Sequence, residues 1–146
     1  MPDPKQIAIV DDDQDLCDLL SSILCAYECR TFTDPKKFLK TIETEKFDLL
    51  ITDLTMPGIS GIAVTQKFRT HFPNTPIIVV SGFVDTLAIS QLMLHNVFTV
   101  IEKPLDAKYL MTQVQNALSE RQDIRRYHQG NLRHLAEKSS TNHKII

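Results

Sequence analysis

Five short apolar runs of strand length recur along the chain, separated by segments in which apolar residues follow a helical spacing. The runs are IAIV at 7–10, CRTF at 29–32, LLIT at 49–52, IIVV at 77–80 and FTVI at 98–101. The first, third and fourth runs are almost continuously apolar, as expected of strands that are covered on both faces. The pattern therefore predicts five strands.

The segments between these runs predict five helices. The first has apolar residues at i, i+3, i+4, i+7 and i+8, the spacing of an amphipathic helix: Leu16, Leu19, Leu20, Ile23 and Leu24. Asp34 and Pro35 predict the start of the second helix, since Asp caps helices and Pro favours the first helical position. Residues 60–72 and 85–95 are expected to form the third and fourth helices, and Asp106 to cap the fifth.

Strands that alternate with helices indicate an α/β protein built from parallel β-α-β units, because a helix is the usual crossover between parallel strands. The expected architecture is an open, doubly wound, five-stranded parallel sheet flanked by five helices. In such sheets ligands bind beyond the carboxyl ends of the strands, near the point where the strand order reverses.

The composition is that of an ordinary globular domain: 42% of the 146 residues are hydrophobic, 23% are charged, and the net charge is -2. This length predicts one domain rather than two. Fifteen acidic residues against ten basic ones up to Leu118 argue against direct nucleic-acid binding. No apolar run is long enough to span a membrane, and the start MPDPKQ lacks a signal-peptide pattern, so we expect a cytoplasmic protein.

Polar residues able to bind metal or phosphate follow four of the predicted strands. Asp11, Asp12 and Asp13 follow the first, Asp53 the third, Ser81 and Gly82 the fourth, and Lys103 and Pro104 the fifth. Carboxylates packed together repel one another, and a hard divalent cation removes that penalty. Magnesium suits the site because it takes one or two carboxylates, water and a phosphate oxygen. A metal ion, a nucleophilic carboxylate and a lysine are what phosphoryl transfer requires.

The residue strings at these strand ends are VDDD, DLTMPGISG, VVSG and EKP. In this order and spacing they resemble the receiver domain of two-component response regulators, over roughly residues 5 to 120. The resemblance implies a flavodoxin-like (receiver) fold and a phosphoprotein of a phosphorelay, with a sensor histidine kinase or phosphotransfer protein as the donor. It also implies that the chain is not an enzyme in the usual sense, because it catalyses only its own phosphorylation and dephosphorylation.

The resemblance assigns the acceptor and the metal ligands residue by residue. It makes Asp53 the phosphoacceptor, forming an aspartyl phosphate. Asp12 would bind Mg2+ (or Mn2+) directly and Asp11 would bind it through water. Asp53 and the backbone carbonyl of Thr55 would complete the protein ligands.

The same resemblance makes Ser81 and Lys103 the residues that bind phosphoryl oxygens and switch with phosphorylation. The residues that shape the neighbouring loops would be Met56, Pro57, Gly58, Gly61 and Pro104. The resemblance also implies a cis peptide bond before Pro104. Asp13 lies one residue past the matched acidic pair, so we expect it to be a loop or helix-capping carboxylate.

Val100 and Asn96 depart from the family pattern. Val100, three residues before Lys103, stands where the family usually has Tyr or Phe, so a switch based on a rotating ring is not expected. We expect Phe98 to share the side of the strand on which Val100 lies, because the two are an even number of residues apart. Asn96 stands where a glycine commonly ends the fourth helix, and Asn tolerates the left-handed conformation that this position requires.

The chain is expected to divide into a receiver domain at 1–120 and a helical extension or linker tail at 121–146. It is either a lone receiver or a fragment cut within a linker to an effector domain. The apolar residues of the fourth helix, DTLAISQLMLHN, either are simply buried or include an exposed strip. An exposed strip would make residues 85–120 a homodimer or effector contact.

Two alternatives to a phosphoacceptor receiver remain. A haloacid-dehalogenase-like phosphatase would use Asp11 as its nucleophile and Asp13 as the second acid of an Asp-x-Asp pair. It needs Thr or Val where Asp15 stands, and it leaves Asp53 without a nucleophilic role. The other alternative is a receiver-like interaction scaffold that works without phosphorylation.

Overall fold

The computed structural model describes residues 3–119, and within them five strands alternate with five helices. The strands are β1 (Gln6–Val10), β2 (Glu28–Phe32), β3 (Leu49–Thr52), β4 (Ile77–Ser81) and β5 (Thr99–Glu102). The helices are α1 (Gln14–Ile23), α2 (Pro35–Thr41), α3 (Gly61–His71), α4 (Thr86–Leu94) and α5 (Ala107–Leu118). Every predicted strand is confirmed to within one residue at each end. The predicted tail at 121–146 lies outside the described residues.

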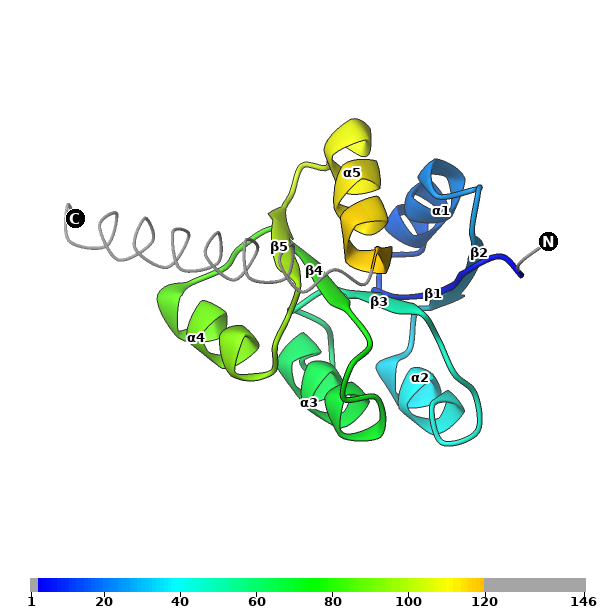
Figure 1. Cartoon of the computed structure of the whole chain (residues 1–146). Coiled ribbons are helices and arrows are strands. Elements are labelled where there is room, and N and C mark those ends of the chain that lie inside the picture. Colours follow the sequence, from blue (N-terminus) through cyan, green and yellow to red (C-terminus); the bar gives the residue numbers. More distant parts are fainter. Residues whose placement is uncertain (1–2, 120–146) are drawn as a thin grey trace.

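The strands form one parallel sheet with the order β2-β1-β3-β4-β5. Helices α1 and α5 cover one face of the sheet, and α2, α3 and α4 cover the other (Figure 1). The expected doubly wound α/β fold is therefore confirmed. The strand order reverses between β1 and β3, which is where such a sheet offers a binding crevice. Within residues 3–119, no helix is long and apolar enough to cross a bilayer.

Each helix begins at a side chain that accepts a hydrogen bond from a backbone N–H of its first turn. These capping residues are Asp13, Asp34, Ser60, Asp85 and Asp106. A cap of this kind satisfies one of the donors that the first turn of a helix leaves unpaired. The predicted caps at Asp34 and Asp106 are confirmed.

Aromatic rings form much of the core between the sheet and helices α2 and α3. Phe38 of α2 is fully buried, and its ring lies 5.2 Å from that of Phe32, 6.0 Å from that of Phe47 and 5.9 Å from that of Phe68 between centroids. Rings at these separations add to the stability that burial of their area provides. The Phe38 ring therefore links α2 to both β2 and α3.

Two side chains lie where the sequence pattern did not place them. Leu19 is 49% exposed, because α1 rests on the sheet through Cys17, Leu20 and Leu24, and Leu19 lies on the flank of that stripe. Phe98 packs on the face that carries α1 and α5, whereas Val100 packs on the opposite face.

The strand explains the correction at Phe98. Strand β5 begins only at Thr99, just after the left-handed Asn96 (φ 54°), so the alternation of side chains does not extend back to Phe98. The left-handed conformation expected at Asn96 is itself confirmed.

Replacing Phe38 by Ala should lower the free energy of unfolding by about 3–5 kcal/mol, because it removes a fully buried ring and leaves a cavity. Phe83→Ala is the matched control: this ring is 71% exposed, so its loss should cost at most about 0.5 kcal/mol. Urea denaturation followed by circular dichroism measures both. Equal losses in the two variants would contradict the packing described here.

Candidate functional site

Two aspartates lie side by side because their strands are neighbours in the sheet. Val10 and Thr52 are partners in the β1–β3 register, and Asp11 and Asp53 are the next residue of each strand. The backbone N–H of Asp53 donates to the Val10 carbonyl (3.1 Å), which continues the ladder beyond β3. The sheet thus places both carboxylates at the point where the strand order reverses.

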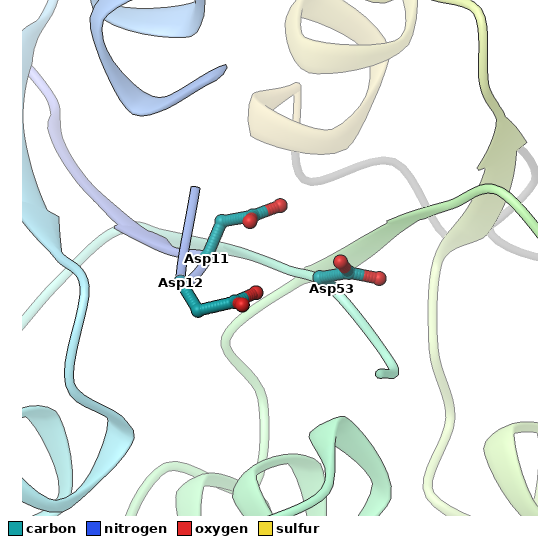
Figure 2. Close-up of side chains that lie close together, drawn as sticks. All are labelled: Asp11, Asp12 and Asp53. Carbon is teal, nitrogen blue, oxygen red and sulfur yellow. The ribbon is translucent and has the colours of Figure 1, made fainter. Parts of the chain in front are cut away.

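Three carboxylates gather at this edge of the sheet. Figure 2 shows the side chains of Asp11 and Asp12 extending from the end of β1, and that of Asp53 from the end of β3, toward one region. Each contributes an oxygen atom that lies within 4.8 Å of the other two. Asp11 and Asp53 are buried, at 3% and 7% exposure, whereas Asp12 is exposed.

Lys103 reaches both buried carboxylates from the end of β5. Its Nζ lies 3.2 Å from Asp53 Oδ2 and 3.5 Å from Asp11 Oδ2. Burial alone would lower the pKa of Lys103, but the charge of Asp11 and the hydrogen bond and charge of Asp53 outweigh it and raise that pKa. The ammonium therefore stays protonated and offsets part of the repulsion between the two carboxylates.

The burial of Asp11 has an electrostatic cost. The pKa of its carboxyl group is raised, mainly by burial, although the hydrogen bond from the Asp13 backbone N–H (2.9 Å to Oδ1) and the charge of Lys103 act to lower it. The negative charges of Asp53 and Asp12 raise it further. Even with Lys103 nearby, the site holds a surplus of negative charge.

This donor set fits a hard divalent cation. Ligands around Mg2+ sit at about 2.1 Å in an octahedron, so they lie roughly 3 to 4 Å from one another. The carboxylate oxygens of Asp12 and Asp53 lie within 4.8 Å of each other and of Asp11, so these two residues need only small shifts to take neighbouring positions in such an octahedron. A cation there would also neutralise the surplus charge that raises the pKa of Asp11.

The loop after Asp53 is pressed against the start of α3 at Gly61. A Cβ added to Gly61 would lie 1.9 Å from the backbone oxygen of Asp53 and 2.6 Å from Cα of Leu54. Only glycine allows this approach. The N–H of Gly61 donates to the Leu54 carbonyl (2.8 Å), so the contact also fixes the backbone beside the acidic residue.

The rest of this loop lies beside Asp53. The N–H of Thr55 donates to Oδ1 of Asp53 (3.3 Å), which orients that carboxylate. Met56 is buried in the core, while Pro57 is exposed and Gly58 has the positive φ of a turn (86°).

The remaining predicted residues lie on β4 and β5. Ser81 is buried at the end of β4, and its hydroxyl donates to the Phe83 carbonyl (3.3 Å). The Lys103–Pro104 bond is cis, as expected. Val100 is only 4% exposed and packs in the core. Because this residue is a valine, the position has no aromatic ring that could move between the interior and the surface.

Asp13 lies outside the carboxylate cluster. Its side chain caps α1 by accepting from the N–H groups of Asp15 (3.0 Å) and Leu16 (3.3 Å). It is thus a helix-capping residue, as expected, and it is engaged away from Asp11. This placement disfavours the phosphatase alternative, which needs Asp13 as an acid beside Asp11.

Cys17 touches the site in a way that the sequence does not reveal. Its thiol is fully buried and lies 3.3 Å from the backbone carbonyl of Asp11, to which it donates. Burial, followed by the negative charge of Asp11, raises the pKa of this thiol to about 11. Cys17 is therefore an unreactive packing residue that supports the backbone of Asp11.

Comparison with known proteins identifies the family. Residues 7–115 match the response regulator receiver domain, and the chain belongs to that family. It is 26% identical over 84% of its length to the phosphoglycerate transport system transcriptional regulatory protein PgtA of Salmonella typhimurium. It is 28% identical over 79% of its length to the DNA-binding transcriptional regulator NtrC of Klebsiella pneumoniae. These alignments span only 30% and 25% of the two relatives.

Solved structures agree with this assignment. A CheY-like response regulator receiver domain protein of Methanospirillum hungatei superimposes with a TM-score of 0.77 at 26% identity, covering 80% of this chain and 95% of that one. A chemotaxis protein of Vibrio cholerae shares the fold, with a TM-score of 0.74 at 22% identity, over 79% of this chain and 99% of that one. The protein is thus a receiver domain of the kind found in two-component signalling.

Gly61→Ala should lower the free energy of unfolding by more than about 2 kcal/mol, because the new methyl group meets backbone atoms that cannot move aside independently. Gly82→Ala is a matched control, since nothing lies within 4 Å of a Cβ added there. It should change stability by no more than about 0.5 kcal/mol. Urea titrations of the two variants test the contact, which is wrong if Gly61→Ala is as stable as Gly82→Ala.

Asp11→Asn should raise the melting temperature of the chelator-treated protein near neutral pH by a few degrees. The raised pKa of Asp11 means that the folded state loses stability as pH rises through that pKa, and Asn removes the charge responsible. The gain should shrink at acid pH, where the wild-type carboxyl group is itself protonated. Asp18→Asn, on the exposed side of α1, is the control and should show no such gain. Thermal melts across pH would contradict this account if Asp11→Asn is destabilised throughout.

Proposed function

We propose that this receiver domain accepts a phosphoryl group on Asp53 in a reaction that depends on Mg2+, with Mn2+ as a substitute. The donor would be a phosphohistidine on a sensor histidine kinase or a phosphotransfer protein. The observation that carries the proposal is the contact of Lys103 with both Asp53 and Asp11 beside a third carboxylate, Asp12. Together these residues would provide a phosphoacceptor, a cation-binding site and an ammonium group that binds phosphate.

In the proposed reaction a carboxylate oxygen of Asp53 attacks phosphorus as the phosphorus–nitrogen bond of phosphohistidine breaks. The electron pair of that bond goes to the imidazole, which leaves as a neutral ring after taking up a proton. The product is an acyl phosphate on Asp53. The Thr55 N–H, bound to Oδ1, holds the carboxylate in orientation during the attack.

When bound, the metal ion would neutralise phosphoryl oxygens and so favour the transfer. Asp12 would hold the ion directly and Asp11 through water, with Asp53 and the Thr55 carbonyl as further ligands. Lys103 would leave Asp11 for a phosphoryl oxygen. Ser81 would exchange the Phe83 carbonyl for another such oxygen.

The output would come from the loop after β4, since Val100 supplies no ring to move. Movement of the Ser81 hydroxyl toward a phosphoryl group would break its hydrogen bond to the Phe83 carbonyl and so free the backbone at Phe83. Beyond this loop, Leu87 and Leu94 of α4 are 69% and 79% exposed, and Tyr109 of α5 is 46% exposed. We propose that residues 85–120 form the homodimer or effector contact.

The domain organisation belongs to the same proposal. Residues 1–120 would be the phosphoacceptor domain and 121–146 a helical extension or linker. The longer relatives have room for effector domains outside the aligned region, so an effector in the same polypeptide or a separate partner would receive the signal. The chain would act on no separate substrate and would catalyse only the gain and loss of its own phosphoryl group.

Incubation with acetyl phosphate and Mg2+ should add one phosphoryl group to the wild-type protein, detected by intact-mass spectrometry. Asp53→Asn should abolish the adduct because it removes the nucleophile, and a chelator should suppress it in the wild type. Asp13→Asn is the matched control, since Asp13 caps α1 outside the cluster, and it should label normally.

Labelling at Asp11, or no labelling under any condition, would contradict the proposal. The first result would favour the phosphatase alternative and the second the scaffold that works without phosphorylation. Peptide mapping of the adduct after borohydride reduction separates Asp11 from Asp53.

A further inference from the structure

An arginine joins the C-terminal ends of α3 and α4. Arg69 lies in the last turn of α3 and is half-buried. Its guanidinium donates to five backbone carbonyls: those of Phe72 (3.0 Å), Pro73 (3.1 Å), Thr75 (2.6 Å), His95 (2.8 Å) and Asn96 (3.2 Å). Three of these belong to the connection from α3 to β4, and two to the connection from α4 to β5.

The chemistry of this contact favours a fixed junction. Phe72 and His95 are the C-cap residues of α3 and α4, and the carbonyls at the end of a helix have no partner within it and carry its negative partial charge. A guanidinium offers five N–H donors in a rigid plane, so it can satisfy carbonyls from two chain segments at once. Figure 1 shows that α3 and α4 lie on the same face of the sheet, so one side chain can span their ends.

The other end of α4 has no comparable tie among the interactions found in residues 3–119. It follows a loop in which Gly82 and Phe83 are exposed. The residue that caps this end, Asp85, bonds only to α4 itself in the hydrogen bonds described. The Asp85 side chain accepts from the backbone N–H of Ala88 (2.7 Å), and the Asp85 backbone carbonyl accepts from the N–H of Ile89 (3.1 Å). These bonds stabilise the first turn of α4 without joining it to another element, and its remaining contacts with the core include the apolar ones of the partly buried Val84 and Ala88.

We propose that Arg69 anchors the C-terminal end of α4, so that the helix turns about this end and opens first at its N-terminal end. The anchored end lies where β4 and β5 enter the sheet, opposite the edge that carries Ser81 and Lys103. Any displacement of the loop after Ser81 therefore moves Phe83 and Leu87 while the far end of α4 stays in place. This inference does not depend on phosphorylation of the protein.

Hydrogen–deuterium exchange of the whole chain, analysed by mass spectrometry, tests the anchor. After correction for intrinsic rates, the wild-type segment 92–98 should exchange more slowly than 84–89. Arg69→Gln should speed exchange at 92–98 by roughly tenfold or more, because charged hydrogen bonds to this segment are lost, and should leave 84–89 within about threefold. Equal or faster exchange at 92–98 than at 84–89 in the wild type would overturn the proposal.

Two further variants separate the anchor from a general loss of stability. Arg30→Gln removes an exposed arginine that pairs with Glu45 on the far edge of the sheet, and it should leave exchange at 92–98 unchanged. Arg69→Lys keeps the charge but lacks the planar fork, and it should fail to restore slow exchange. Uniform acceleration over all segments in Arg69→Gln, or full recovery in Arg69→Lys, would overturn a specific anchor formed by the guanidinium.

Discussion

The structure depends on the ion pairs that stabilise two buried carboxylates at the ends of β1 and β3. Asp11 and Asp53 would repel each other strongly if they stood alone in the interior. Lys103 makes their proximity tolerable, but a single ammonium does not balance the three carboxylates of the cluster. The imbalance is a cost to the fold, and it would at the same time be the source of affinity for the proposed cation. The negative charges of Asp11, Asp12 and Asp53 therefore lower the stability of the fold, and the same charges would favour binding of the proposed cation.

The sheet supplies the precision that this site needs. Residues that follow adjacent parallel strands are held by the strand register itself, so Asp11 and Asp53 need no other device to meet. The loop after Asp53 is less constrained, and there the fold uses a contact that leaves no room for a side chain at Gly61. Rigid strands position the charged groups, and close backbone packing positions the loop behind them.

The sequence predicts the strands and the acidic cluster because both leave strong local marks. Buried parallel strands must be apolar, and an aspartate directly after such a strand stands out. The structure differs from the prediction at Leu19 and Phe98, because spacing alone does not tell which part of an apolar stripe the sheet covers, or where a strand begins. The roles of Cys17 and Arg69 leave no mark, since both contact main-chain oxygens that every residue possesses.

That last property has an evolutionary consequence for Arg69. All five of the acceptors described for it are main-chain oxygens, so the residues that provide them can drift to other types without disturbing the geometry, provided that the path of the chain is kept. Among the residues that form these five hydrogen bonds, only Arg69 must then keep its side chain. Substitutions on the exposed surface of α4 would then leave the proposed anchor at Arg69 in place.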